Sequence, residues 1–369
     1  EHLAPRRLAP SSRLGSGPTA DGGAQCVALT PTAAATEELD GPVLPQGRKL
    51  DWRTRGLIAA GLDLEEMRAK FWEDGFYIVK NVVGEDERLN VQYELAELVD
   101  DTARAAGKAG QWEEEPWETR LLRLFEDDLD AAPEIYRPEC HKAGLFCLFF
   151  HPAILDIASY IIGTQELRIY PNYGTRPKLP GKHRDEVLWH TDAGYTYFGP
   201  AADADKPDVR DDGMTPELVE SEMAQSMVNC WTAMVPVTRN EGCMQFARGS
   251  HLQGLVQHAY RRDDFGADTR EGHWLHVDPA VLESYCTPES GRVVDVEVEP
   301  GDIVLFHQHL LHSSQLPNLS DKVRWAFDFR FQDLSKSTLR QTQGHVARSQ
   351  EHPELAVINA EDWASREFT

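Results

Sequence analysis

The stretch VVDVEVEPGDIVLFHQHLLHSSQLPNLSDKVRWAFDFRFQ, residues 293–332, carries the clearest fold signal in this chain. Three short apolar or alternating runs within it predict β-strands at 293–297, 302–307 and 323–332. A Pro-Gly-Asp turn separates the first two runs. Short strands joined by turns are typical of a sandwich or barrel, and they do not fit a fold of alternating β-α units.

The sequence upstream continues this pattern back to about residue 166 and is helical before that point. Further strands are predicted at 167–173, 187–190, 227–236 and 243–246. Apolar residues at helical spacing predict a helix followed by a strand within 62–82, and helices at 86–107 and 152–162. The buried stripe of the helix at 86–107 is expected to hold Leu89, Val91, Leu95 and Leu98. We therefore expect a mostly β fold with flanking helices.

These patterns divide the chain into four parts. An Ala-, Pro-, Ser- and Gly-rich start predicts a disordered or surface arm over residues 1–60. The helical part follows at 61–165, the strand-rich core at 166–335 and a C-terminal extension at 336–369. Residues 199–226 form a long acidic insertion in the core, which is expected to be either a solvated surface loop or a lid over a site.

Composition excludes several classes of partner. The chain has 369 residues, with 37 Lys and Arg against 61 Asp and Glu, and its formal net charge of -24 argues against binding nucleic acid or anionic membranes. The most apolar neighbourhood, 144–162, is interrupted by polar residues and by a proline, so we expect no membrane-spanning helix. Six cysteines without a CxxC pair predict reduced thiols and a cytoplasmic location.

A candidate metal site lies in the strand-rich half. His190 and Asp192 are two residues apart, and in a strand such residues point to the same face. His307, His309 and His312 each offer a third ligand. Two histidines and one carboxylate are the facial triad of non-haem Fe(II) oxygenases, which leaves three coordination positions open. An HxD pair by chance is also common in a chain with 14 histidines.

The run at 323–332 places charge inside an aromatic strand. Arg324, Asp328 and Arg330 share one face, while the opposite face is aromatic. A buried arginine needs an anionic partner, which a dicarboxylate co-substrate would supply through two parallel hydrogen bonds. A structural salt bridge to Asp or Glu would account for the same residue.

From about residue 67 to 332 the chain resembles the phytanoyl-CoA dioxygenase family of Fe(II)/2-oxoglutarate oxygenases. Four ordered blocks carry the resemblance. They are FWEDGF at 71–76, the segment 151–163, the group NCWTAM, RNEGCM and RGSH within 229–251, and the closing block from Gly301-Asp302 to Arg324. This resemblance implies a double-stranded β-helix core, of jelly-roll or cupin-like form, with an N-terminal helical layer.

The resemblance also implies roles for particular residues. The iron ligands fall on His190, Asp192 and His312, because the family has its distal histidine eleven residues after the Gly of Gly-Asp. Arg324 falls on the partner of the distal carboxylate of 2-oxoglutarate, with Arg330 as the alternative. Other positions implied to bind the co-substrate are Trp231, Ser314, Tyr170 and Asn172.

The implied activity is that of a dioxygenase that uses Fe(II), 2-oxoglutarate and O2 to hydroxylate or otherwise oxidise a small molecule, with release of succinate and CO2. The carboxylate of Asp192 argues against halogenation, since related halogenases lack it. A small-molecule substrate is the only partner expected, apart from a second copy if the protein is a homodimer rather than a monomer. Two alternatives keep the barrel: a metal-binding module, or a cupin-type dioxygenase that does not use 2-oxoglutarate.

Overall fold

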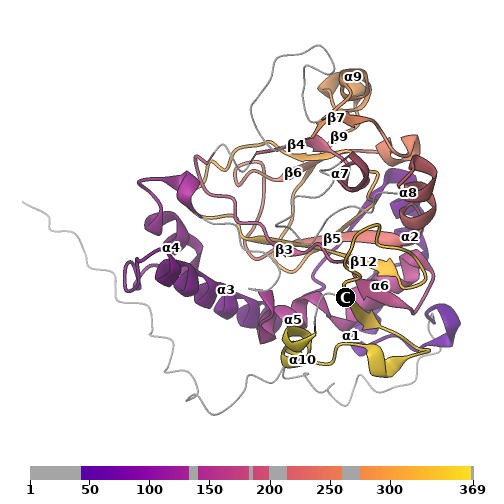
Figure 1. Cartoon of the computed structure of the whole chain (residues 1–369), viewed down its shortest axis with the longest axis horizontal. Helices are drawn as coiled ribbons and strands as arrows, with labels where there is room; N and C mark the ends of the chain where they lie inside the picture. Colours follow the sequence, from indigo (N-terminus) through magenta and orange to yellow (C-terminus); the bar gives the residue numbers. More distant parts are fainter. Residues whose placement is uncertain (1–42, 133–139, 183–185, 199–213, 260–274, 367–369) are drawn as a thin grey trace, which may run out of the picture.

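The computed structural model describes residues 43–132, 140–182, 186–198, 214–259 and 275–366 (Figure 1). Its centre is a pair of antiparallel sheets that lie in two layers, with apolar side chains from both sheets packed between them. This arrangement confirms the expectation of short strands in the second half of the chain and shows that they pair in an antiparallel way.

The larger sheet has the order β1-β10-β5-β12-β2-β13, and β3 also pairs with β12. Its strands are β1 (Phe76–Val79), β10 (Ile303–Phe306), β5 (Met227–Ala233), β12 (Ala326–Asp333), β2 (Leu167–Ile169), β13 (His345–Arg348) and β3 (Gly174–Thr175).

The smaller sheet has the order β4-β11-β6-β9. Its strands are β4 (Val187–His190), β11 (His312–Ser314), β6 (Met244–Ala247) and β9 (Val293–Val296). A separate two-stranded ribbon consists of β7 (His258–Ala259) and β8 (His276–Val277).

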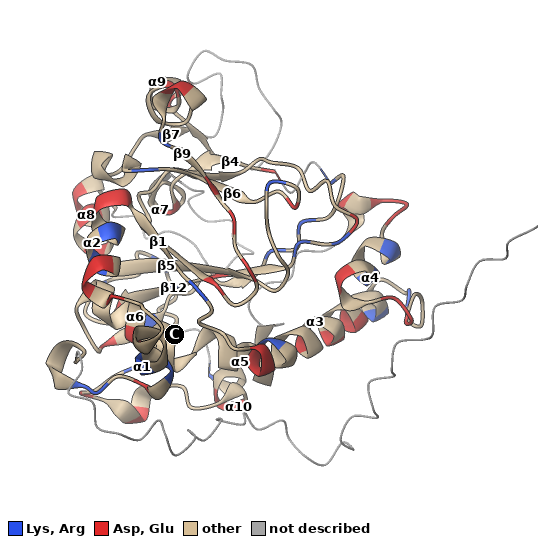
Figure 2. Ribbon diagram, turned by 180° about the vertical axis from the view of Figure 1, so that it is seen from behind, with Lys and Arg blue, Asp and Glu red and all other residues tan. Residues whose placement is uncertain are grey.

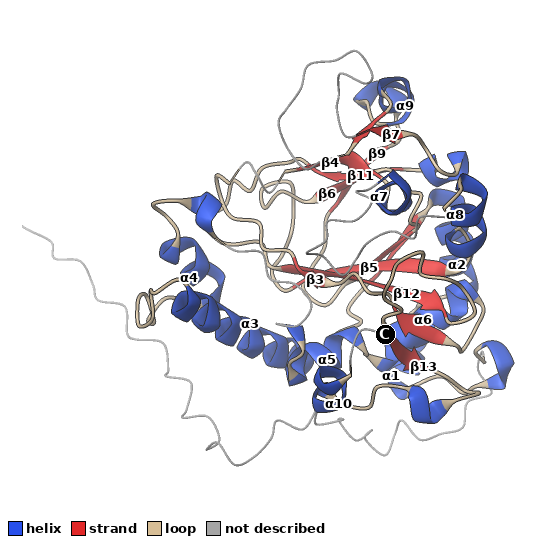
Figure 3. Cartoon of the chain, viewed as in Figure 1, coloured by secondary structure: helices blue, strands red, loops and turns tan. Residues whose placement is uncertain are grey.

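Helices cover the outer face of the larger sheet (Figure 3). They are α1 (Trp52–Ala59), α2 (Leu64–Asp74), α3 (Glu85–Ala105), α4 (Trp117–Leu124), α5 (Ala143–Phe149), α6 (Pro152–Ile162) and α10 (Ala360–Ser365). The other helices are α7 (Asp192–Phe198), α8 (Pro216–Met223) and α9 (Pro279–Tyr285). Asp and Glu positions recur along α3 (Figure 2), in keeping with the negative net charge.

Local sequence signals set the ends of these helices. Pro152 occupies the first turn of α6, where its missing N–H costs nothing, and Gly163 ends the helix in a left-handed conformation at φ 90°. The side chain of Asp63 caps α2 by accepting hydrogen bonds from the backbone N–H groups of Glu65 and Glu66. Both helices therefore lie within the predicted ranges.

The alternation predicted for 323–332 separates two environments. Trp325, Phe327, Phe329 and Phe331 belong to the core between the larger sheet and the helices. Arg324, Ala326, Asp328 and Arg330 project from the opposite face, toward the smaller sheet. β12 thus supplies the aromatic core on one side and charged groups to the interior between the sheets on the other.

Several expectations need correction. Among the described residues, helices hold more residues than strands, so the fold is not mostly β; α3 alone has 21 residues. The surface arm does not extend to residue 60, because Leu44 and Leu50 are buried in the core and α1 packs against α6. Residues 1–42 lie outside the described part. Leu89 is 55% exposed and does not belong to the buried stripe of α3.

The segments around the core also differ from their expected form. The C-terminal extension is part of the larger sheet, since β13 pairs with β2. In the acidic insertion, α8 is held on the body by Glu220, which accepts a hydrogen bond from the Leu255 backbone, and by the backbone oxygen of Ala224, which accepts one from His307. Residues 199–213 of the insertion lie outside the described residues, so its role as a lid stays a prediction.

The apolar stretch 143–162 is long and apolar enough to cross a membrane by length and composition alone. In the structure it is two helices, α5 and α6, separated at Phe150 and His151, and most of it is buried inside the fold. Its apolar character is therefore explained by the core.

Cys147 in this stretch forms a disulfide, so the expectation that every thiol is reduced is wrong at this residue.

Candidate metal centre

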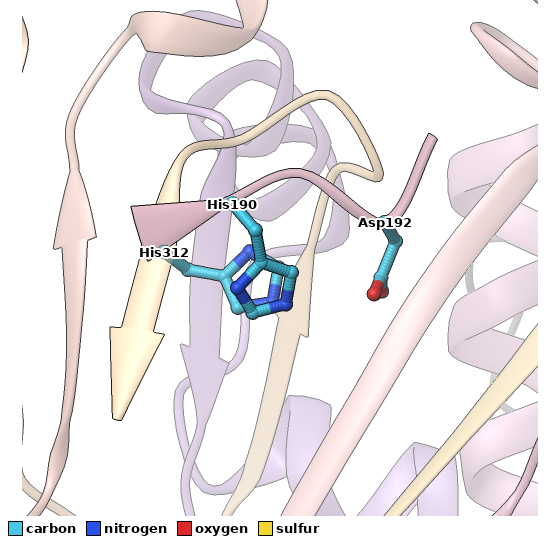
Figure 4. A group of neighbouring side chains, drawn as sticks. All are labelled: His190, Asp192 and His312. Atoms are coloured by element: carbon cyan, nitrogen blue, oxygen red, sulfur yellow. The ribbon is translucent and has the colours of Figure 1, made fainter. Parts of the chain in front are cut away.

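His190, Asp192 and His312 lie together between the two sheets (Figure 4). One ligand atom from each residue lies within 4.8 Å of the others. The two histidines are brought side by side by the pairing of β4 with β11, in which His190 and His312 are directly opposite each other. Their ring centroids are 4.1 Å apart. The three residues predicted as iron ligands are thus gathered at one place.

The three predicted ligand residues are the ones that cluster, but the backbone predicted around them is wrong. His190 is the last residue of β4, and Asp192 is the first residue of α7, so the two do not share the face of one strand. The chain turns at Thr191, whose hydroxyl accepts a hydrogen bond from the Gly194 N–H at 2.9 Å. This helix start, rather than a strand, directs the carboxylate toward the imidazoles.

His258 supports the turn from the neighbouring ribbon. Its Nε2 accepts a hydrogen bond from the Thr191 N–H at 3.1 Å, and its Nδ1 donates to the backbone oxygen of Val256 at 2.8 Å. The ring fills the space beside Gly194, where a Cβ atom would lie 2.2 Å from it. His258 was not among the predicted site residues, and its isolated position in the sequence offers no signal for this role.

Protonation states at the cluster suit a divalent cation. Nδ1 of His190 donates to the Leu188 oxygen at 2.7 Å and Nδ1 of His312 to the Leu310 oxygen at 2.9 Å, which leaves each Nε2 as a lone-pair donor. Burial lowers the pKa of both imidazoles, so they are neutral. Burial alone would raise the pKa of Asp192, but the guanidinium of Arg330 holds it well below its usual range. Two imidazole nitrogens and one carboxylate therefore fit Fe(II).

The other two histidines considered as metal ligands, His307 and His309, interact with other groups. His307 accepts a hydrogen bond from the His309 N–H at Nδ1 and donates from Nε2 to the Ala224 oxygen. Nδ1 of His309 lies 3.7 Å from a carboxylate oxygen of Glu220. Among the described residues, neither histidine belongs to the metal-ligand cluster.

Three of the residues predicted to bind the co-substrate also lie together. Arg324 is buried, donates from Nη1 to the Gly242 oxygen at 2.9 Å, and lies 3.4 Å from the hydroxyl of Ser314. Its guanidinium carbon is 5.5 Å from the ring centroid of Trp231. These contacts define a cationic cluster just before β12, on the side that faces the smaller sheet.

Lys178 belongs to the same cluster and was not identified from the sequence. Its side chain is buried, and its Nζ donates to the backbone oxygen of Ser314 at 2.7 Å and to the hydroxyl of Ser314 at 3.1 Å. The backbones of Lys178 and Arg324 form a β-bridge, so two cationic side chains enter from adjacent positions. Sequence spacing alone does not show this bridge, because the two residues are far apart in the chain.

Tyr170 and Asn172 lie beside Arg330 rather than beside Arg324. The Tyr170 hydroxyl donates to the Thr338 oxygen at 2.7 Å and accepts from Nε of Arg340 at 2.9 Å. The backbone oxygen of Asn172 accepts from Arg330 at 2.9 Å. Six residues along a strand span about 20 Å, so these positions are far from the cationic cluster at Arg324.

Two further polar side chains that face the same interior have buried atoms without hydrogen-bond partners. Asn229 on β5 is 1% exposed, and among the described residues neither its Nδ2 nor its Oδ1 has a partner. Asp328 on β12 bonds through Oδ2, but its buried Oδ1 has no partner. Native proteins rarely leave such groups unsatisfied, so these atoms mark a place where a ligand or water is required.

Comparison with known proteins identifies the family. The family model described as Phytanoyl-CoA dioxygenase (PhyH) matches residues 71–326, and the chain belongs to this family. The family predicted from the sequence is thereby confirmed, and Fe(II) and 2-oxoglutarate are the cofactor and co-substrate that this membership indicates.

Individual relatives are distant. Peroxisomal phytanoyl-CoA dioxygenase of Mus musculus is 23% identical over 256 residues, which cover 68% of this chain and 62% of that protein. The 1-deoxypentalenic acid 11-beta-hydroxylase of Streptomyces arenae is 32% identical over 109 residues, 28% of this chain and 35% of that protein. The matched region thus spans about three fifths of the length of the mouse relative. Among solved structures, the non-heme monooxygenase ThoJ is similar with a TM-score of 0.47 and 20% identity, over 78% of this chain and 84% of that one.

Proposed function

We propose that this protein is an Fe(II)- and 2-oxoglutarate-dependent dioxygenase that hydroxylates, or otherwise oxidises, a small molecule. The observation that carries the proposal is the cluster of His190, Asp192 and His312, whose donor set and protonation states fit Fe(II). Fe(II) with 2-oxoglutarate and O2 supplies an oxidation of the substrate that is coupled to release of succinate and CO2. We assign the two facing sheets to a double-stranded β-helix, with the metal site between them.

We assign the cationic cluster to the co-substrate, as one end of its binding pocket. Arg324 and Lys178 pair with the distal carboxylate of 2-oxoglutarate, and the Ser314 hydroxyl, which touches both side chains, donates to the same group. Arginine and lysine side chains donate charge-assisted hydrogen bonds to carboxylates, and the distal carboxylate of a dicarboxylate suits such a pair of donors. Trp231 forms a wall of this pocket.

The unpartnered interior groups point to the chemistry of the substrate. Within the described part of the chain, the amide oxygen of Asn229 and one carboxylate oxygen of Asp328 have no hydrogen-bond donor. 2-Oxoglutarate carries no hydrogen-bond donor at neutral pH, so it cannot satisfy these acceptors. We therefore infer a substrate that presents a hydroxyl or amino group near β5 and β12, rather than a bare alkyl chain.

The decisive experiment is anaerobic titration of the Fe(II)-loaded protein with 2-oxoglutarate. Chelation of Fe(II) by the co-substrate gives a weak visible charge-transfer band, and we expect this band to appear and saturate. Fe(II) binding without the band would favour a cupin-type dioxygenase or a metal-binding module instead. Succinate release in a screen of hydroxyl- and amino-bearing compounds against their deoxy or deamino analogues then tests the substrate class.

A further inference from the structure

Arg330, on β12, makes a close contact with the candidate iron ligand Asp192. Its Nη2 lies 2.9 Å and its Nε 3.2 Å from the same carboxylate oxygen, Oδ2. The Arg330 side chain is 6% exposed and that of Asp192 is 16% exposed. The pair is therefore a buried, charge-assisted contact between the larger sheet and the residue that starts α7.

Further polar contacts fix the orientation of the Arg330 guanidinium. Nη1 of Arg330 donates to the backbone oxygen of Asn172 at 2.9 Å and lies 3.4 Å from Oδ2 of Asp328. Arg176 also donates to that oxygen of Asp328, at 2.9 Å. All three nitrogens of Arg330 thus have partners, and the orientation of its planar fork is determined by the strands rather than by Asp192 alone.

Asp192 needs such support because the sheet does not provide it. The two histidines are held by β4, by β11 and by their Nδ1 hydrogen bonds. Asp192 instead begins a helix of seven residues after a turn. In the described residues, the hydrogen bonds that hold its carboxylate come from Arg330.

We propose that Arg330 is a positioning residue of the iron site, which occupies Oδ2 of Asp192 and leaves Oδ1 to bind the metal through one oxygen. This inference rests on the proposed function. Partners that orient a ligating carboxylate typically change metal affinity 10- to 100-fold when they are removed. Arg330 also neutralises the carboxylate charge, and this second effect acts in the opposite direction, because a more negative ligand attracts a cation more strongly.

Because the two effects change metal affinity in opposite directions, the sign of the change in Co(II) affinity tests the proposal. The probe is Co(II), titrated anaerobically into the metal-free protein in place of Fe(II) and followed through its visible bands. We expect Arg330→Lys, which keeps the charge but loses the fork, and Arg330→Gln, which loses the charge, both to bind Co(II) about 10- to 100-fold more weakly. The bands should also change shape, because a freed carboxylate can bind through both oxygens.

Arg176→Gln is the matched control, since Arg176 contacts Asp328 but leaves both bonds from Arg330 to Asp192 in place. It should bind Co(II) as the wild type does. If both Arg330 variants keep the Co(II) affinity and the visible bands of the wild type, the contact between Arg330 and Asp192 does not position the ligand. If Arg330→Gln binds Co(II) more tightly, the main effect of Arg330 on the site is to neutralise the charge of Asp192. Either result overturns the proposal. Failure of the wild type to bind Co(II) or to form the 2-oxoglutarate band would instead overturn the proposed function. If Arg330→Gln does not fold, Arg330→Lys still decides the question.

Discussion

At the scale of single residues, the buried pair of Asp192 and Arg330 links stability to the metal site. Asp192→Ala removes the ligand and also takes from the buried guanidinium of Arg330 the closer of its two carboxylate partners, leaving Asp328, which Arg330 shares with Arg176. Breaking a buried pair in this way costs about 3–5 kcal/mol. We therefore expect the free energy of unfolding of the metal-free protein, measured in urea, to fall by about that amount in Asp192→Ala.

The double variant Asp192→Ala/Arg330→Met is the control for this prediction. Because it removes both charges, it should recover most of the lost stability without recovering metal binding. Equal stability of the single and double variants would show that the two side chains do not interact as a pair.

Arg324 is expected to act on the co-substrate and not on the metal. Arg324→Gln leaves Lys178 as the remaining buried cation of the pocket, and loss of one partner from a charge-assisted pair in such a site corresponds to about a 10²-fold or larger loss of affinity. The 2-oxoglutarate affinity of Arg324→Lys should fall between that of the wild type and that of Arg324→Gln, since lysine keeps the charge but not the planar guanidinium fork. The measurement is titration of the charge-transfer band with 2-oxoglutarate. A near-normal affinity in Arg324→Gln would remove Arg324 from this role.

At the scale of elements, the turn from β4 into α7 is tightly packed at Gly194. Gly194 has no room for a side chain, because a Cβ would lie 2.2 Å from the ring of His258. Gly194→Ala should therefore displace either His258 or the Thr191 turn, at a cost of about 1–3 kcal/mol in stability and with weaker Co(II) binding. Gly56→Ala in α1 is a matched control, since nothing lies within 4 Å of the added Cβ and a helical Ala is favoured over Gly. Equal effects of the two substitutions would contradict this account of the turn.

Helices and strands whose ends carry local sequence signals could be predicted from the sequence. Residue positions that are determined by tertiary contacts could not. Pro152 and Gly163 mark the ends of α6, and turn residues mark β10 and β12. No local pattern shows that Asp192 begins a helix, because the turn at Thr191 depends on His258, more than sixty residues later. Lys178 was missed for the same reason, since only the bridge to Arg324 brings it to the pocket. The metal ligands were found because residue type and the family resemblance identify them without knowledge of the local backbone.

At the scale of the whole molecule, buried neutral histidines make stability depend on pH. Burial lowers the pKa of His307 to about 3 and that of His345 to about 4, and both side chains are almost fully buried. In the unfolded chain the same groups titrate near 6.5. Below that pH the unfolded state binds more protons than the folded state, so stability is complete above about pH 6.5 and is lost as the pH falls toward 4.

Each such histidine contributes a slope of about 1.4 kcal/mol per pH unit within this window. Urea unfolding of the metal-free protein at pH 7, 6 and 5 measures the total slope. His345→Gln should be less stable than the wild type at pH 7 but lose stability less steeply toward pH 5, by about one histidine's share. His352→Gln serves as the control, since that side chain is 64% exposed, and it should leave the slope unchanged. A slope in His345→Gln equal to that of the wild type would mean that His345 does not stay neutral in the fold, and the acid sensitivity would then have to arise from the other buried histidines between the sheets and the helices.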